Sequence, residues 1–252
     1  MTTTTTVLQR INAAIDRPIR RMLLSQRLAK AYVFSSYADA EGSGEGKVFD
    51  RALNRATDPK LKNMIRKHQE DELRHERILE ERREQLGLPR LVIPPHLKMI
   101  DKLSAAAGGL WDLPMDRDEH VARMYTLLFV IEERALEEFS KAADLLEELD
   151  DLQSAEVLRS IAADEARHLK YCRAIGRRYA ESDEAFERGI ETMRDLEQRV
   201  YAEQGRSMVK HMIDEGLLEL PVAWRLFLGP LLRIAGRLDV GKPLNQPAAL
   251  AA

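Results

Sequence analysis

Apolar residues recur at helical spacing through most of the chain. Between residues 58 and 85, for example, Leu61, Ile65 and Leu79 share one side of a helix while charged residues occupy the other. This period of about 3.6 residues is that of an amphipathic helix. We find no run of alternating apolar and polar residues of the kind that indicates a strand. The pattern therefore predicts an all-α protein.

Start and stop signals divide the chain into five long helices. Asp58 followed by Pro59 is a good helix start, and Gly87 with Pro89 marks the end of that helix. The connection that follows is long, rich in proline and glycine, and carries a short helical piece near residues 97–107. The expected long helices cover about residues 19–56, 58–85, 118–148, 151–180 and 182–215.

An internal repeat relates the two halves of this pattern. A shift of 93 residues, without a gap, places Asp71-Glu72-x-Arg74-His75 on Asp164-Glu165-x-Arg167-His168. The same shift places Asp58 on Asp151, Arg66 on Arg159 and Asp39 on Glu132. Two helical hairpins joined by a long crossover have the topology of a ferritin-like four-helix bundle. We expect an N-terminal tail and short helix at 1–18, this bundle at 19–180 with its crossover at 88–118, and extra C-terminal helices and a tail at 181–252.

The repeated motif places acids and histidines on apolar helix faces. Glu72 and His75 are three residues apart, as are Glu165 and His168, so each pair shares a face. Those faces are otherwise apolar, and Glu132 likewise sits among aromatic and aliphatic residues. These polar groups are therefore predicted to point into the core.

Several carboxylates buried together need cations, because like charges at short distance cannot all ionise. Two divalent ions would neutralise four carboxylates, and mixed oxygen and nitrogen ligands suit iron or manganese better than calcium or structural zinc. We predict two iron ions per chain, with manganese as the alternative in one or both positions. The predicted ligands are Asp39, Glu72, His75, Glu132, Glu165 and His168, of which Glu72, Glu132 and Glu165 are also the candidate catalytic residues.

Two of these ligands have a close rival. Glu41 lies two residues from Asp39, and only the repeat alignment favours Asp39. Glu132 is preferred to Glu133, which lies off the apolar stripe.

Residues 19–180 resemble the ferritin-like di-iron carboxylate superfamily, on the doubled Asp-Glu-x-Arg-His motif with an acid 33 residues before each glutamate. The motif is similar to that of the oxygen-activating branch, and Ile131–Ser140 with Asp164–His168 is similar to MiaE-type hydroxylases. The resemblance implies a non-haem oxidoreductase that activates dioxygen to oxidise or hydroxylate an organic substrate, with electrons from a separate donor protein. It also implies that Asp71 and Asp164 support the histidines and that Arg74 and Arg167 brace those aspartates.

Two other functions stay open. One is ferroxidase or iron handling, or peroxide scavenging of the rubrerythrin-like kind, although Ala135 replaces a glutamate of that family. The single cysteine, Cys172, also excludes a rubredoxin-type iron site. The other is a non-enzymatic helical interaction protein.

Composition and charge bear on the expected partners and cellular location. A net charge of −3 and a pI near 6.1 give no general reason to expect nucleic acid. The chain lacks an uninterrupted apolar run of about 18 residues, and its cysteine usage fits a reducing, cytoplasmic location. The apolar segment 217–238, which carries Trp224 and Phe227, is expected to pack on its own bundle or in a homodimer, rather than to lie on a membrane surface.

Some residues favour a structural interpretation. His68, one turn before Glu72, is expected to be a hydrogen-bonded core histidine, and Tyr32 and Tyr125 to pack in the core. Glycines at 42, 44 and 46 disfavour regular helix. We expect a bulge or break that ends the first helix early; the alternative hypothesis is a gap that admits substrate beside the metals.

Overall fold

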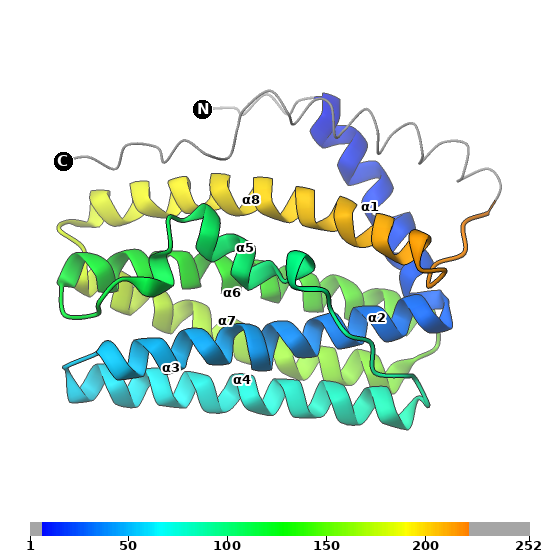
Figure 1. Ribbon diagram of the computed structural model, residues 1–252, viewed down its shortest axis with the longest axis horizontal. Helices are drawn as coiled ribbons and strands as arrows, with labels where there is room; N and C mark the ends of the chain where they lie inside the picture. Colours follow the sequence, from blue (N-terminus) through cyan, green and yellow to red (C-terminus); the bar gives the residue numbers. More distant parts are fainter. Residues whose placement is uncertain (1–6, 222–252) are drawn as a thin grey trace.

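The computed structural model describes residues 7–221, and throughout that range the regular elements are helical (Figure 1). The α-helices are α1 (Val7–Ser25), α2 (Arg27–Ala38), α3 (Gly46–Arg55), α4 (Pro59–Gln85), α5 (Met99–Ala106), α6 (Asp118–Glu148), α7 (Leu152–Tyr179) and α8 (Asp183–Asp214). A π-helix, η1 (Asp39–Glu45), joins α2 to α3, and short 3-10 turns η2 (Pro95–Leu97) and η3 (Leu110–Asp112) flank α5. The predicted all-α class is confirmed for this part of the chain.

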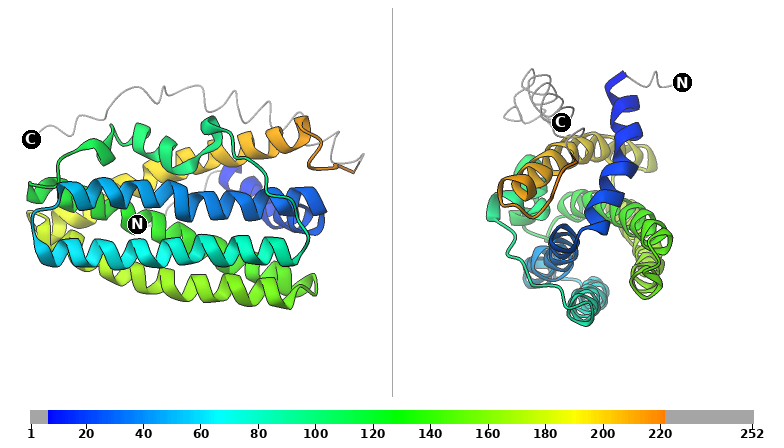
Figure 2. Two further views of the ribbon diagram at one scale, coloured as in Figure 1. Left: turned by 60° about the horizontal axis from the view of Figure 1, so that its bottom comes forward. Right: turned by 90° about the vertical axis from the view of Figure 1, so that its right-hand side faces the viewer.

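Four long helical rods lie lengthwise beside one another and form a bundle. The rods are α2–η1–α3, α4, α6 and α7, as Figures 1 and 2 show. The α6–α7 hairpin has the most extensive contact, α4 packs against α2 and α3, and α4 also meets α7. The two hairpins therefore face each other along their length.

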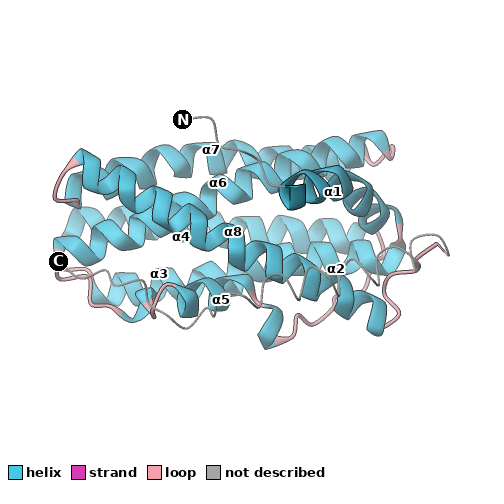
Figure 3. Cartoon of the chain, turned by 90° about the horizontal axis from the view of Figure 1, so that it is seen from above, coloured by secondary structure: helices cyan, strands magenta, loops and turns pink. Residues whose placement is uncertain are grey.

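Three further helices cover this bundle. The crossover from α4 to α6 contains α5, which contacts both η1 and α8. Helix α8 runs along α6, while α1 projects from one end of the bundle and contacts α2 and α6 (Figures 2 and 3). The predicted crossover with its short helix is confirmed.

Helix ends follow the expected capping chemistry. The Asp58 side chain accepts a hydrogen bond of 2.8 Å from the Lys60 N–H, and Pro59 occupies the first helical position of α4. Its repeat counterpart Asp151 accepts one of 3.2 Å from the Ser154 N–H. Gly87 ends α4 with a φ of 62°, a left-handed conformation that glycine adopts without steric cost.

The prediction of one helix over 19–56 is wrong at Gln26, where the structure has a break that the sequence analysis did not predict. The chain leaves the helical conformation at Gln26 (φ −103°, ψ 133°), so residues up to Ser25 belong to α1. The Gln26 side chain there exchanges two hydrogen bonds of 2.8 Å with the backbone of Glu219. This partner is distant in sequence, so local propensity gives no signal for the break. At Asp39–Glu45 the expected bulge is present as a π-helix, but it does not end the rod, which continues directly into α3.

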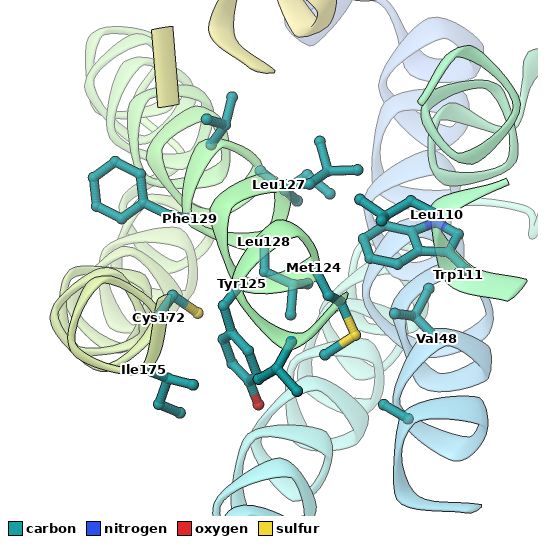
Figure 4. Close-up of a cluster of buried hydrophobic side chains, with 14 of the residues drawn as sticks. Val48, Leu110, Trp111, Met124, Tyr125, Leu127, Leu128, Phe129, Cys172 and Ile175 are labelled. Carbon is teal, nitrogen blue, oxygen red and sulfur yellow. The ribbon is translucent and has the colours of Figure 1, made fainter. Parts of the chain in front are cut away.

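Two buried apolar clusters lie along the bundle, one toward each end. The first joins α3, α6, α7 and η3, and its members include Val48, Trp111, Tyr125, Leu128 and Cys172 (Figure 4). The second joins α2, α6, α7 and the end of α8. These clusters fix the helix positions on both sides of the polar residues between them.

None of the helices within residues 7–221 is both long enough and apolar enough to cross a bilayer. Most of the apolar segment 217–238, including Trp224 and Phe227, lies outside the described residues, as does the threonine run at the start of the chain.

Candidate metal centre

Seven acids and histidines meet in the middle of the bundle, and all are buried. They are Glu41 from η1, His68, Glu72 and His75 from α4, Glu132 from α6, and Glu165 and His168 from α7. Five of these are predicted ligands, and they come together from both halves of the repeat. They form two adjoining groups of potential metal ligands that share Glu72: His68, Glu72, Glu132 and His168, and Glu41, Glu72, His75 and Glu165.

Two carboxylates reach both groups. Glu72 places Oε1 at 3.1 Å from Nδ1 of His168 and Oε2 at 3.2 Å from Nδ1 of His75. Glu165 does the same from the opposite hairpin, with Oε2 at 3.1 Å from His168 Nδ1 and Oε1 at 3.2 Å from His75 Nδ1. Each of the two carboxylates therefore lies between the two histidines, with one oxygen toward each.

Glu132 and Glu41 supply one further carboxylate to each group. Glu132 Oε2 lies 3.6 Å from His168 Nδ1, and Glu41 Oε2 lies 3.1 Å from His75 Nδ1. The two histidines thus present Nδ1, rather than Nε2, to the carboxylates.

Within the described residues Asp39 lies outside both groups of potential metal ligands, and Glu41 lies in one of them instead. The Asp39 carboxylate accepts a hydrogen bond of 2.6 Å from the side chain of Lys98, which belongs to the crossover between α4 and α6. It lies one helical turn after Ser35, whose hydroxyl accepts from the Leu91 N–H of the same crossover. Glu41 instead follows Ala38 by three residues and is only 4% exposed. The gapless repeat alignment gave the wrong residue because the π-helix changes the register of one half only.

Glu133 lies outside the cluster, as predicted from its place off the apolar stripe. Its carboxylate accepts two hydrogen bonds of 2.6 Å from Arg194 on α8. Glu132, in contrast, is 1% exposed.

Each of the two histidines is held from behind by an aspartate of the other half. His75 Nε2 lies 3.3 Å from Asp164, and His168 Nε2 lies 3.3 Å from Asp71. Arg74 bonds to both aspartates, and Arg167 does so at 2.6 and 3.0 Å. The support implied by the resemblance is present, but it is reciprocal between hairpins. An Nε2–H that donates to aspartate leaves Nδ1 free to bind a cation.

In the metal-free protein the carboxylates of the cluster differ in the direction of their pKa shifts. Burial, together with the charge of Glu72, raises the pKa of Glu41, and burial with Glu72 and Glu132 raises that of Glu165 to about 8. Burial also disfavours charge on Glu132, but the facing His68 outweighs it and lowers the Glu132 pKa to about 2.

The histidines are shifted in the opposite sense. Burial works against a charged imidazole, yet the carboxylate of Glu132 raises the pKa of His68 to about 9. Hydrogen bonds that the imidazoles donate to the surrounding carboxylates also raise the pKa values of His75 and His168 against the effect of burial. Protons on the imidazoles thus balance the negative charge of the carboxylates in the metal-free protein. Bound divalent cations would balance the same charge.

The buried polar atoms fit a bound cation. Within the described residues, Oε1 of Glu72, Glu132 and Glu165 are each buried without a hydrogen-bond partner, as are both ring nitrogens of His68. In the metal-free protein these oxygens face imidazole nitrogens at 3.0–3.2 Å, and bound cations would take the place of the protons there. Carboxylate oxygens and imidazole nitrogens in one dry site are the donors that iron and manganese take. The residues present therefore fit a pair of divalent metal ions.

His68 departs from its sequence interpretation. It is buried as expected, but it lies inside one of the two ligand groups rather than in a hydrogen-bonded core position. Its spacing of one turn from Glu72 places it on the same helix face, which was the available signal.

The remaining structural interpretations can be compared directly. Tyr32 and Tyr125 are fully buried, and the Tyr125 hydroxyl lies 2.8 Å from that of Tyr171. The space beside Gly42 is filled: a Cβ there would lie 1.9 Å from Oε2 of Glu76. This contact favours the bulge over an open gap for substrate.

Comparison with protein-family models, with curated proteins and with solved structures finds no match for this chain. Functional inference therefore depends on the geometry of the centre itself.

Proposed function

We propose that this protein is a ferritin-like, non-haem di-iron oxidoreductase that activates dioxygen to oxidise or hydroxylate an organic substrate. The observation that carries the proposal is the pair of buried carboxylates, Glu72 and Glu165, each of which reaches both ligand groups. Such a pair, with one histidine and one further carboxylate on each side, would hold two divalent ions. A site for a single ion does not need two carboxylates that each face two separate groups of ligands.

The charges support divalent ions. Glu41, Glu72, Glu132 and Glu165 carry four negative charges when ionised, which two divalent ions would balance with neutral imidazoles. The nitrogen donors favour iron over calcium or magnesium, which prefer oxygen alone. Manganese in one or both positions is the alternative.

A bound pair of iron ions would supply the electrons and Lewis acidity that reduction of dioxygen requires. The protein orients the ligands and keeps bulk water away from them. Asp71 and Asp164 hold the Nε2 protons of His168 and His75, and so fix both rings with Nδ1 turned inward. The apolar clusters on either side keep bulk water away from the ligands.

The stoichiometry of a hydroxylation requires an electron donor. One oxygen atom enters the substrate and the other leaves as water, so two electrons and two protons must come from outside the reaction centre. The sequence contains no flavin or dinucleotide fingerprint, which is why we assign the electrons to a separate donor protein.

Metal analysis and a single turnover test the proposal. Protein reconstituted without oxygen should hold about two iron ions per chain, the number that a doubled ligand set of this kind binds. Rapid mixing of the ferrous protein with dioxygen should consume oxygen and oxidise the centre. Protein that binds no iron would overturn the proposal. Iron oxidation by an assembly that then accumulates a ferric mineral core would support iron handling instead.

A further inference from the structure

His68 points into the metal centre although the doubled motif does not include it. Its side chain is 1% exposed, and Nε2 lies 3.0 Å from Glu72 Oε1 and 3.0 Å from Glu132 Oε1. Its ring centroid is also 4.0 Å from that of His168. The imidazole is therefore in the group that contains Glu132, and away from Glu41.

Close approach without hydrogen bonding suggests that these atoms face a common ion. Neither ring nitrogen of His68 has a hydrogen-bond partner within the described residues, and the same holds for the two facing oxygens of Glu72 and Glu132. In the metal-free protein the imidazole and the two carboxylates form an ion pair at 3.0 Å, without the alignment of a hydrogen bond. A cation between these three atoms would satisfy all of them.

The repeat shows that this feature is confined to one half. The shift of 93 residues places His68 on Ile161, which is fully buried in the apolar cluster beside α2. The group around His75 consequently has a single imidazole, whereas the group around His168 has two.

We propose that His68 is a seventh ligand, which coordinates through Nε2 the ion held by His168 and Glu132 and makes the two metal positions unequal. The inference rests on the proposed di-metal centre and deepens it. The position with two imidazoles offers one more donor and binds its ion more tightly, because imidazole is a strong ligand for late divalent metals. The position at Glu41 and His75 keeps fewer protein donors, and so more room for exchangeable ligands.

Cobalt(II) titration of the metal-free protein tests the inference, because its visible absorption reports ligand number at each position. We expect two binding steps in the native chain. His68→Leu should weaken the tighter step by at least about 10-fold, the lower end of the loss caused by removing even an outer partner of a ligand. It should also change the absorption of that step and leave the weaker step in place. His168→Leu serves as the matched ligand variant, and His120→Leu, which alters a histidine bonded to the Pro114 carbonyl, serves as the control.

The outcomes separate this inference from the proposed function. If the native protein binds no cobalt, the di-metal centre itself is wrong. If it binds two ions and His68→Leu binds both with unchanged affinity and spectrum, His68 is no ligand and the centre stands.

A measurement on the native chain covers the case in which His68→Leu and the milder His68→Gln both fail to fold. Proton NMR of the cobalt-loaded native protein counts coordinated imidazoles, since each contributes a strongly shifted ring N–H signal. Three such signals support the inference, and two overturn it.

Discussion

Nε2 of His75 on α4 lies 3.3 Å from Oδ2 of Asp164 on α7, and the exchanged pair, His168 and Asp71, has the same 3.3 Å separation. Each histidine is thus oriented by the hairpin to which it does not belong. Arg74 and Arg167 bond to both aspartates and tie the two motifs together. The orientation of each histidine therefore depends on a contact with the other half of the repeat.

This exchange predicts equal effects from the two aspartates. Asp164→Ala and Asp71→Ala should each weaken metal binding by about 10–100-fold, because an outer partner fixes the tautomer and basicity of a ligating histidine. Competition with a coloured chelator measures the affinity. Asp144→Ala, at an exposed acid beside Arg159, is the control and should leave the affinity unchanged. Retention of native affinity by both variants would contradict the proposed role of the aspartates.

The choice between Asp39 and Glu41 can be tested by a paired substitution. Glu41→Gln should lower metal content and weaken one of the two ions, since it removes a buried carboxylate 3.1 Å from His75 Nδ1. Asp39→Asn should leave both ions bound, because that side chain contacts Lys98 instead. Metal analysis after gel filtration distinguishes the variants, and the reverse pattern would restore the assignment of Asp39.

The metal-free protein should lose stability as the pH rises. The pKa of His68 is raised from 6.5 to about 9, and that of Glu165 from 4.5 to about 8. A group with a raised pKa in the folded state stabilises that state below its unfolded pKa and loses this contribution as the pH rises through its folded pKa. We therefore expect the melting temperature of chelator-treated protein to fall between pH 6.5 and 9.

Metal-loaded protein provides the contrast for that pH series. Bound cations replace the protons on the imidazoles, and metal affinity rises as those protons leave. Its melting temperature should therefore hold or rise over the same interval. A metal-free protein whose melting temperature rises toward pH 9 would show that protons do not balance the carboxylates.

Gly42 lies against the end of the Glu76 side chain. In Gly42→Ala the new Cβ would lie 1.9 Å from Oε2 and 2.1 Å from Cδ of Glu76, so that side chain must move. Because the carboxylate is the far end of a flexible side chain, and because alanine favours helix by about 1 kcal/mol over glycine, we expect the free energy of unfolding to change by less than about 1 kcal/mol. Urea titration measures it. A larger loss that Glu76→Ala recovers would show that the Glu76 side chain cannot move away.

The sequence by itself determined the helical class, the helix ends at Asp58 and Asp151, and the inward acids and histidines of the doubled motif. Periodicity and capping are local properties, so they are readable without the fold. The gapless repeat also showed that Glu72 and Glu165 occupy equivalent positions in the two halves.

Tertiary structure decided the rest. The break at Gln26 depends on Glu219, far along the chain, and the π-helix at Asp39–Glu45 turned Glu41 rather than Asp39 toward the ligands. The exchange of Asp71 and Asp164 between hairpins, and the approach of His68 to Glu132, are contacts between helices. Sequence spacing fixes which face of a helix a residue occupies, but only the packing of one helix against another fixes what that face meets.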